Sequence, residues 1–324
     1  MRTIAIEEHF LASGFREALQ RSVAGSNGGL PPQLETKLAD LGSNRLKDMD
    51  AGGIDLQVLS HTVTGMDALP ADEDVRLAQQ ANDQLAETIA THLSRFAGFA
   101  TLPMTNPDAA AVELERAVRS LGMKGAAING TTNGRFLDDP SFLPILERAV
   151  ALDVPIYIHP GIPPAPVREA YYAGFDPAVN FALSTGGWGW HSETGIHALR
   201  LILSGVFDRL PGLQIIIGHM GEMLPFMLAR INNVFSPLTK QLQRSVPEYF
   251  LQNFHITTSG FFTEPPLLLL LQIVGADRII FSVDYPFSTN EQGRAFLTSA
   301  SISPADKEKI SHLNAERLLK IAEA

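Results

Sequence analysis

Histidine and carboxylate side chains close four of the short apolar runs in this sequence. The first run ends with Glu7 and His9, and later runs end with His159, His219 and Asp284. Imidazole nitrogens and carboxylate oxygens bind Zn²⁺, Mn²⁺ and similar divalent ions, and both groups also transfer protons. The chain contains no cysteine, so thiolate ligands and a thiol nucleophile are excluded. If the runs meet in space, these residues predict a metal site built from nitrogen and oxygen donors.

The runs can bring these residues together as parallel strands that end at one edge. Runs rich in β-branched residues alternate with longer amphipathic segments, which is typical of strand–helix units around a parallel sheet. Strands are expected over residues 3–9, 55–61, 96–102, 124–129, 155–159, 214–219, 254–259 and 278–284. Helices are expected over residues 72–93, 107–121, 140–152, 192–207, 222–235, 265–274 and 314–322.

Eight such units favour an α/β fold of the closed (β/α)8 TIM-barrel type, whose active sites lie at the carboxyl ends of the strands. An open, doubly wound sheet is the alternative. The chain lacks the glycine-rich and Walker-type motifs that bind nucleotides, which weakens that alternative.

The spacing of the first motif predicts which side chains face the barrel interior. Glu7 and His9 are two residues apart, so a pleated strand points both to the same face. Glu8 then faces the outer helices, where a buried carboxylate needs a partner, and we expect it to be structural. His61 ends the second strand and can reach the rim, whereas His255 begins the seventh strand and is expected to be structural.

Length and composition describe a large folded chain with an acidic balance. It has 324 residues, with 25 basic and 35 acidic side chains and a formal net charge of −10. This balance argues against nucleic acid as a partner, because phosphate binding needs clustered Lys and Arg. Apolar residues make up 45% of the chain, enough for a large core. The longest apolar stretch, near 267–271, is far shorter than the roughly 20 residues that cross a bilayer, so no membrane association is expected.

The chain is predicted to be a single domain over residues 1–324, because the strand–helix alternation runs throughout without a linker. Two stretches interrupt the pattern: a Gly- and Pro-rich one at 25–32 and a long aromatic and Gly-rich one at 160–190. Long loops within a compact domain are often functional lids or oligomer contacts. The N-terminus has no basic start or cleavage site of a signal peptide, so a cytoplasmic protein is expected.

Five motifs, in this order, resemble the amidohydrolase-2 family. They are Glu7-x-His9, Ile158-His159-Pro160, Gly218-His219-Met220-Gly221-Glu222, Thr257-Thr258-Ser259-Gly260 and Phe281-Ser282-Val283-Asp284-Tyr285-Pro286-Phe287. Within the family, the chain is most similar to the non-oxidative aromatic acid decarboxylases typified by γ-resorcylate (2,6-dihydroxybenzoate) decarboxylase. The resemblance covers nearly the whole chain. It implies a metal-dependent (β/α)8 barrel with one divalent ion, Mn²⁺ or Zn²⁺ before Mg²⁺, in a homo-tetramer or homo-dimer.

The resemblance also implies roles for individual residues. Those implied as metal ligands are Glu7, His9, His159 and Asp284. His219 and Glu222 are implied as a hydrogen-bonded pair beside the metal, Arg230 as a contact to the substrate carboxylate or to another subunit, and Phe287 as an aromatic wall. A glutamate at position 7 is typical of the benzoate decarboxylase branch. Lys124 begins the fourth strand, at the wrong edge for a lysine that bridges two metals, so a mononuclear site is expected.

These groups predict the loss of CO₂ from an ortho-hydroxybenzoate or a similar small aromatic acid, a reaction that is reversible in principle. The metal is expected to chelate carboxylate and phenolate together, which orients the ring and offsets charge. Asp284 is expected to protonate the ring carbon, and His219, oriented by Glu222, is the competing acid–base group. Glu222 is expected to open the helix over 222–235, with Arg230 two turns later on a similar face.

Two alternatives remain open beside this carbon–carbon lyase. A metal-dependent hydrolase would activate water against a lactone, amide or carbon–carbon bond in aromatic catabolism, and would add water to the product without releasing CO₂. A catalytically idle barrel that binds aromatic acids or serves as an assembly subunit would hold no metal at this edge, or would hold it without turnover.

Overall fold

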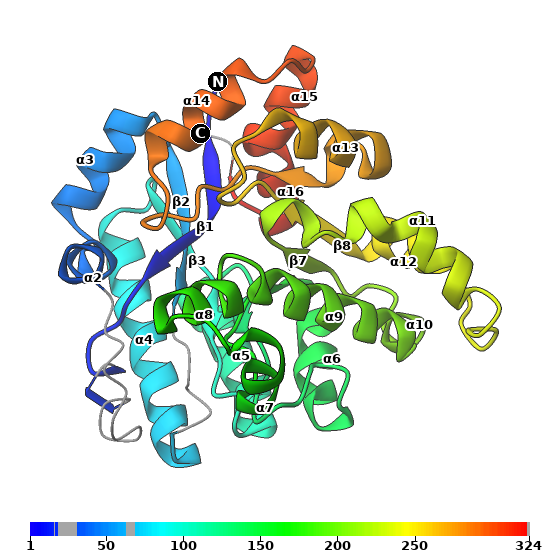
Figure 1. Ribbon diagram of the computed structural model, residues 1–324. Coiled ribbons are helices and arrows are strands. Elements are labelled where there is room, and N and C mark those ends of the chain that lie inside the picture. Colours follow the sequence, from blue (N-terminus) through cyan, green and yellow to red (C-terminus); the bar gives the residue numbers. More distant parts are fainter. Residues whose placement is uncertain (16, 19–30, 63–68, 323–324) are drawn as a thin grey trace.

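Parallel strands form the centre of the molecule (Figure 1). The computed structural model describes residues 1–15, 17–18, 31–62 and 69–322. Neighbouring strands pair in parallel, in the orders β1-β2-β3 and β4-β5-β6-β7-β8-β9. The strands are β1 (Ile4–Phe10), β2 (Leu56–His61), β3 (Phe96–Gly98), β4 (Ala100–Thr101), β5 (Ala126–Asn129), β6 (Ile156–His159), β7 (Ile215–Ile217), β8 (Phe254–Thr257) and β9 (Ile279–Ile280).

Backbone hydrogen bonds join the two sheets into a ring. Between β3 and β4 the chain changes partner at Phe99, whose N–H donates to Leu59 O of β2 over 2.9 Å, while β4 pairs with β5. On the other side, His9 N–H of β1 donates to Tyr285 O beyond β9 over 2.7 Å. The predicted (β/α)8 fold is therefore confirmed, and the partner change explains why the strand expected over 96–102 is divided.

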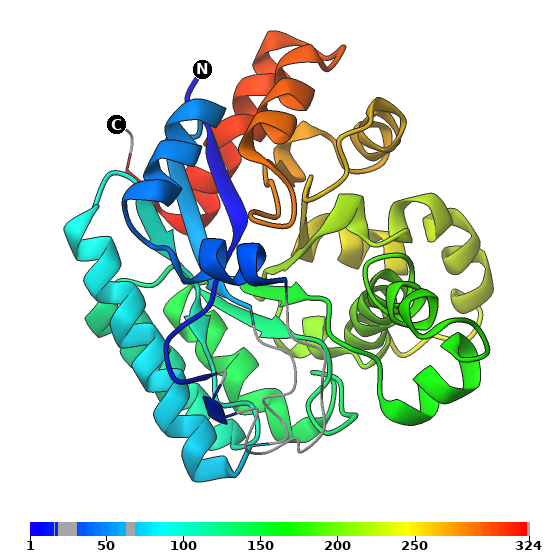
Figure 2. The same ribbon diagram turned by 60° about the vertical axis from the view of Figure 1, so that its left-hand side comes forward.

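Helices surround the strands on the outside (Figures 1 and 2). They are α2 (Pro32–Ala39), α3 (Ser43–Gly52), α4 (Ala71–Thr91), α5 (Pro107–Leu121), α6 (Leu143–Leu152), α7 (Ala165–Val167), α8 (Pro177–Ser184), α9 (Gly189–Leu203), α10 (Val206–Arg209), α11 (Leu224–Phe235), α12 (Val246–Asn253), α13 (Glu264–Val274), α14 (Asn290–Ser299), α15 (Pro304–Glu308) and α16 (Asn314–Leu319). None of the helices that the structure describes has the length and apolar character that crossing a membrane requires.

Local signals explain where the predicted helices begin and end. In α5, proline occupies the first turn and the Asn106 side chain accepts the Ala109 N–H over 3.2 Å, which caps the helix. Gly122 ends the same helix in the left-handed conformation, at φ 74°. The helix expected over 107–121 therefore has the bounds that its capping residues predict.

The structure can be compared with the two long loops that the sequence predicted, at 25–32 and 160–190. The segment 160–190 is largely helical, with α7, a π-helical turn over Arg168–Tyr172, and α8. The side chain of Asp176 accepts the Ala178 N–H over 2.9 Å and starts α8. Of the stretch at 25–32, residues 25–30 lie outside the described part of the chain. The helices α2, α3, α12 and α14 were not among the predicted helices either.

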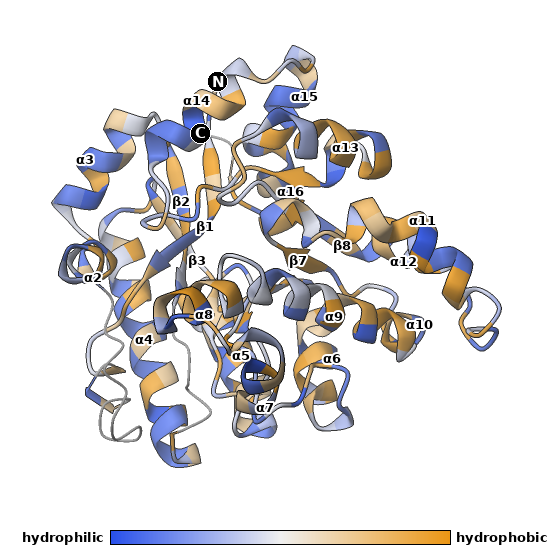
Figure 3. Cartoon of the chain, in the orientation of Figure 1, coloured by the Kyte–Doolittle hydropathy of each residue, from blue (hydrophilic) through white to orange (hydrophobic). Residues whose placement is uncertain are grey.

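The strands β1, β2, β6, β7 and β8 are buried on both faces. Figure 3 shows the hydrophobic residues along the strands, for example in β7. The register shows which side chains point inward. His9 pairs with Ser60, so the two side chains lie on the same face of the sheet. Val58 lies two residues before Ser60 in β2 and therefore faces the interior too. The register of β1 shifts between Ala5 and Glu8, so Ile6 and Glu7 can both face inward. Apolar residues of this interior form one cluster with two residues of α16: Ile4, Ile6, Leu56, Val58, Ala97, Phe99, Tyr157, Ile216, Ile280, Ala315 and Leu319. The histidine and carboxylate side chains lie next to this apolar layer, at the carboxyl ends of the strands.

Candidate metal centre

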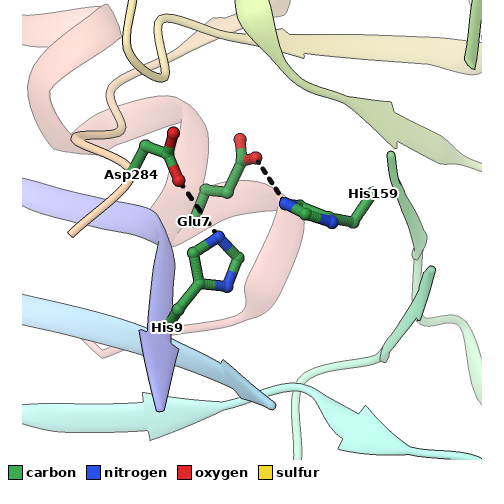
Figure 4. A group of neighbouring side chains, drawn as sticks. All are labelled: Glu7, His9, His159 and Asp284. Carbon is green, nitrogen blue, oxygen red and sulfur yellow. Dashed lines mark ion pairs between the residues drawn. The ribbon is translucent and has the colours of Figure 1, made fainter. Parts of the chain in front are cut away.

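Four side chains from distant parts of the chain meet at the carboxyl end of the barrel (Figure 4). Glu7 and His9 come from β1, His159 ends β6, and Asp284 follows β9. Each offers one nitrogen or oxygen atom, and these atoms all lie within 4.8 Å of one another. His9 Nε2 is 3.2 Å from Asp284 Oδ1, and His159 Nε2 is 3.5 Å from Glu7 Oε1. The structure thus brings together the residues that the sequence indicated as ligands.

Hydrogen bonds orient Glu7 so that only one of its oxygens faces this centre. Its Oε2 accepts hydrogen bonds from the hydroxyls of Tyr157, Ser259 and Thr257. Its Oε1 is buried and has no hydrogen-bond partner among the described residues. A glycine is needed nearby, because a Cβ on Gly218 would stand 2.9 Å from Glu7 Oε2. The carboxylate is therefore held by three hydroxyls and aimed at the centre with its free oxygen.

The two histidines are oriented in the same way. His159 Nδ1 lies 2.8 Å from Pro160 O, which can only accept, so Nδ1 carries the proton and Nε2 keeps its lone pair. His9 Nδ1 lies 3.2 Å from Ser60 Oγ, and His9 Nε2 is buried without a hydrogen-bond partner in the described part of the chain. Outer hydrogen bonds of this kind fix the tautomer of a metal-binding imidazole.

The donor set fits one divalent ion. Two imidazole nitrogens and two carboxylate oxygens converge, and two of these buried atoms, Glu7 Oε1 and His9 Nε2, lack another partner among the described residues. Buried polar atoms are rarely left unpaired, so the arrangement calls for a cation. Nitrogen and oxygen donors of this kind suit Mn²⁺ or Zn²⁺.

Burial and mutual charge shape the ionisation of these groups. Burial raises the pKa of Glu7, and the neighbouring Asp284 adds to this while His219 acts against it. Burial and the nearby His9 hold the pKa of His159 well below its usual range, so this ring is neutral, as a ligand must be. Burial also opposes the charge of Asp284, but contacts with His219 and His9 hold its pKa below the usual range.

A second group of side chains lies beside the centre. His219 Nδ1 and Glu222 Oε1 are 2.8 Å apart, and His191 Nδ1 lies 2.6 Å from Glu222 Oε2. His219 Nε2 is 3.8 Å from Asp284 Oδ2, so the ring links Glu222 to the ligand set. Burial acts against the charge of His219, but Glu222 and Glu7 raise its pKa well above the usual range.

The prediction that Glu222 opens a helix is wrong. Glu222 is left-handed, with φ 52°, and lies in an irregular turn after β7, whereas α11 begins at Leu224. The left-handed turn, not a helix end, folds the carboxylate back onto His219. Glu222 is buried while Arg230 is exposed, so the two do not share a helix face.

His191, on α9, is a functional candidate that the sequence reasoning missed. Besides Glu222, its ring contacts Gly186 O through Nε2, at 3.1 Å. No spacing rule links position 191 to position 222, so the sequence carries no signal for this contact. The sequence did not indicate Tyr157 and Ser259 as site residues either. Tyr157 lies two residues before His159, and Ser259 lies two residues after Thr257, the last residue of β8.

Phe287 and Arg230 lie in different surroundings. The Phe287 ring is 5.6 Å from the His9 ring, edge to face, and 44% of the residue is exposed, so it lies at the mouth of the site. Trp190 packs near the His159 ring at 6.3 Å. Arg230 is exposed on α11, three and four residues after the exposed Met227 and Phe226, and so lies on the outer face of that helix.

The remaining histidines of the strands do not join the centre. His61 ends β2 but packs between Phe10 and Phe15, with ring centroids 5.3 and 4.2 Å away. Burial lowers the pKa of His61 to about 3, so it is neutral. His255 begins β8, and its Nε2 lies 3.0 Å from Arg278 Nη1, at the opposite end of the barrel from the ligands.

Known proteins resemble this chain in sequence and fold over nearly its whole length. The amidohydrolase family model matches residues 33–321. The γ-resorcylate decarboxylase of Rhizobium sp. (strain MTP-10005) is 40% identical over 329 residues, which cover 98% of each chain. A crystal structure of 2,6-dihydroxybenzoate decarboxylase complexed with 2,6-dihydroxybenzoate superposes with a TM-score of 0.89 at 38% identity, covering 99% of each chain.

A structure of dihydroxybenzoic acid decarboxylase from Polaromonas sp. JS666, with bound manganese and the inhibitor 2-nitroresorcinol, also has a TM-score of 0.89. It is 37% identical and covers 100% of this chain and 98% of that one. The sequence motifs, the closed barrel and the full-length matches agree, and the chain belongs to the amidohydrolase family.

Proposed function

We propose that the protein is a metal-dependent, non-oxidative decarboxylase of an ortho-hydroxybenzoate-type aromatic acid, and that residues 1–324 are one catalytic domain. The observation that carries the proposal is the convergence of Glu7, His9, His159 and Asp284 beside the His219–Glu222 pair. The relatives support the same chemistry, since the matching proteins from Rhizobium and Polaromonas are named as decarboxylases of dihydroxybenzoic acids.

The four ligand candidates would hold one divalent ion, and Mn²⁺ is the first choice because the Polaromonas relative contains manganese. When bound, the ion would orient the carboxylate and phenolate of the substrate and offset their charge. Phe287, at the mouth, supplies an apolar surface for the ring. The apolar layer below the ligands closes the site on the other side.

The chain's own residues supply the proton. The pKa of Asp284 is held low and that of His219 is held high, so His219 carries the proton in the resting site. His219 passes this proton to Asp284, and Asp284 donates it to the ring carbon that carries the carboxylate. The bond to the carboxylate then breaks, CO₂ leaves, and the electron pair restores the aromatic ring. Asp284 Oδ2 lies 3.8 Å from His219 Nε2, so His219 is placed to return a proton to Asp284. Glu222 holds the His219 ring through Nδ1 and keeps Nε2 directed at Asp284.

The test is to load the protein with Mn²⁺ and screen hydroxybenzoates for CO₂ release in isotope-labelled water. We expect CO₂ and a phenol, with hydrogen from water on the ring. Labelled oxygen in the product without CO₂ would identify a hydrolase instead, and bound Mn²⁺ without turnover of any substrate would indicate an idle barrel.

Replacing Asp284 by Asn tests the proton donor. The variant should fold normally but lose at least about 100-fold in turnover, the typical contribution of a general acid. Because Asp284 is also a ligand candidate, the Mn²⁺ content is measured together with the rate. Wild-type turnover in the Asn variant would remove Asp284 from the reaction.

We also propose that the protein works as a homo-oligomer, a dimer or tetramer, in the cytoplasm. The outer face of α11 exposes Phe226 at 76% and Met227 at 42%, and Arg230 lies beside them. Apolar groups gathered on a helix surface are typical of subunit contacts. Arg230 would then contact a second copy of the chain. Sedimentation of the wild type and of a Phe226→Glu variant measures this, and a monomeric wild type would contradict it.

A further inference from the structure

Glu8 occupies a position that the proposed reaction does not use. It is fully buried on the outer side of β1. Its Oε1 accepts the backbone N–H of Val283 over 2.9 Å, and its Oε2 accepts the backbone N–H of Tyr285 over 3.1 Å. One carboxylate thus binds both amides that flank Asp284. The fully buried side chain has a defined partner for each oxygen, as a buried carboxylate requires.

The backbone between those two amides needs support. Asp284 has a φ of 71°, in the left-handed region that residues with a Cβ rarely adopt. The strand β9 ends at Ile280, so no sheet pairing holds residues 283–285. The bond from His9 N–H to Tyr285 O, 2.7 Å long, is the third link between β1 and this segment. Position and direction of the Asp284 carboxylate therefore depend on β1.

Arg45 holds the same segment from the other side. Its guanidinium donates to His9 O through Nη2 and to Gln57 Oε1 through Nη1, over 3.2 Å for the latter. The guanidinium also lies 4.8 Å from the centre of the Tyr285 ring. Arg45 is fully buried. Burial raises the pKa of Glu8 to about 8, and the amides of Val283 and Tyr285 and the charge of Arg45 act against this rise. The strand that carries Glu7 and His9 and the segment that carries Asp284 are thus fastened as one unit.

We infer that Glu8 is a positioning residue for the metal centre: by holding the amides on both sides of Asp284, it sets the distance between Asp284 and the ligands of β1. The inference rests on the proposed metal centre. Glu8 alternates with the ligands along β1, so one strand supplies ligands from its inner face and their support from its outer face. Supporting groups of this kind typically change metal affinity 10- to 100-fold.

The experiment compares Mn²⁺ binding to the wild type and to Glu8→Gln and Glu8→Asp. Glutamine keeps one acceptor and turns an NH₂ group toward a backbone N–H. Aspartate is one methylene shorter and cannot reach both amides without backbone movement. The matched control is Glu113→Gln, since Glu113 is also buried and accepts hydrogen bonds from Asn82 and Arg116, at 2.6 and 2.8 Å, far along the chain from the ligands.

Mn²⁺ dissociation constants and the Mn²⁺ electron paramagnetic resonance spectrum are recorded for each protein, with unfolding in chelator as the measure of stability. We expect both Glu8 variants to bind Mn²⁺ about 10- to 100-fold more weakly, with an altered spectrum, while Glu113→Gln loses stability but keeps wild-type affinity. If either soluble Glu8 variant kept wild-type affinity and spectrum, the inference would be overturned. A wild type that binds no Mn²⁺ would instead overturn the proposed centre.

Discussion

Replacing Tyr157 by Phe tests whether the hydroxyls around Glu7 set its metal-binding oxygen. The tyrosine is buried inside the barrel, and its hydroxyl donates to Glu7 Oε2 and lies 3.1 Å from Thr257 Oγ1. The substitution removes one oxygen atom and leaves the packed ring in place. Glu7 then keeps two of its three hydroxyl donors, and the carboxylate gains freedom to rotate away from the centre.

The expected magnitude follows from the number of donors lost. Removal of a group that orients a metal ligand typically weakens metal binding 10- to 100-fold, which corresponds to about 1.4–2.7 kcal/mol. A hydrogen bond to a charged group also contributes about 1.5–3 kcal/mol to folding, so some stability is lost as well. Isothermal titration with Mn²⁺ separates the two effects, because unfolding can be measured independently in the presence of chelator.

The matched control is Tyr249→Phe. Tyr249 is equally buried, and its hydroxyl donates to Asp208 and accepts the Arg244 N–H over 3.2 Å, away from the ligands. This variant should lose stability and keep its affinity for Mn²⁺. If Tyr157→Phe bound Mn²⁺ within about twofold of the wild type, the expected 10- to 100-fold loss would be absent and the argument about Glu7 would be refuted.

Two further predictions concern histidines outside the ligand set. His191→Phe should lower kcat about 10-fold or more without changing Mn²⁺ affinity, because Glu222 loses a hydrogen-bond partner at 2.6 Å. His191→Gln keeps a hydrogen-bond donor and should retain more activity. Equal kcat values for the two variants would contradict the role of this contact. Burial lowers the pKa of His197 from an ordinary 6.5 to about 3. The unfolded chain therefore binds a proton at this residue more readily than the folded chain, and the stability that is present above pH 6.5 is lost as the pH falls toward 3. Between pH 7 and 5 the wild type should therefore lose about 2 kcal/mol more than His197→Gln in urea unfolding, and parallel losses would disprove this.

Strand periodicity predicted that the candidate ligands of β1 and β6 would converge, because it is a local rule. Glu7 and His9 share a face, and the carboxyl end of a barrel strand is where His159 had to be. Asp284 was also expected there, although the strand itself stops at Ile280 and a left-handed residue, not the pleat, turns the carboxylate inward. The edge of the barrel could be predicted from the sequence, but the path by which Asp284 reaches it could not.

The contacts that orient the ligands were harder to predict because they join residues far apart in the chain. Tyr157 precedes His159 by two residues, so the same pleat places its hydroxyl inside the barrel, and this signal was available. His191 reaches Glu222 from a helix, across 31 positions, and no periodicity relates the two. Residues on neighbouring strands can thus be found by pattern, whereas residues brought in by helices and turns require the fold.

The turn after β7 shows why a correct contact can be predicted for a wrong reason. Three-residue spacing suggested that Glu222 reaches back to His219, and it does, at 2.8 Å. A helix start at Glu222 would have pointed the carboxylate along the helix face shared with Arg230. Instead His219, Met220, Glu222 and Met223 are all left-handed, and such a run of residues with a Cβ is costly. Strained residues of this kind cluster where a fold positions chemical groups, so the turn supports the role that we propose for the His219–Glu222 pair.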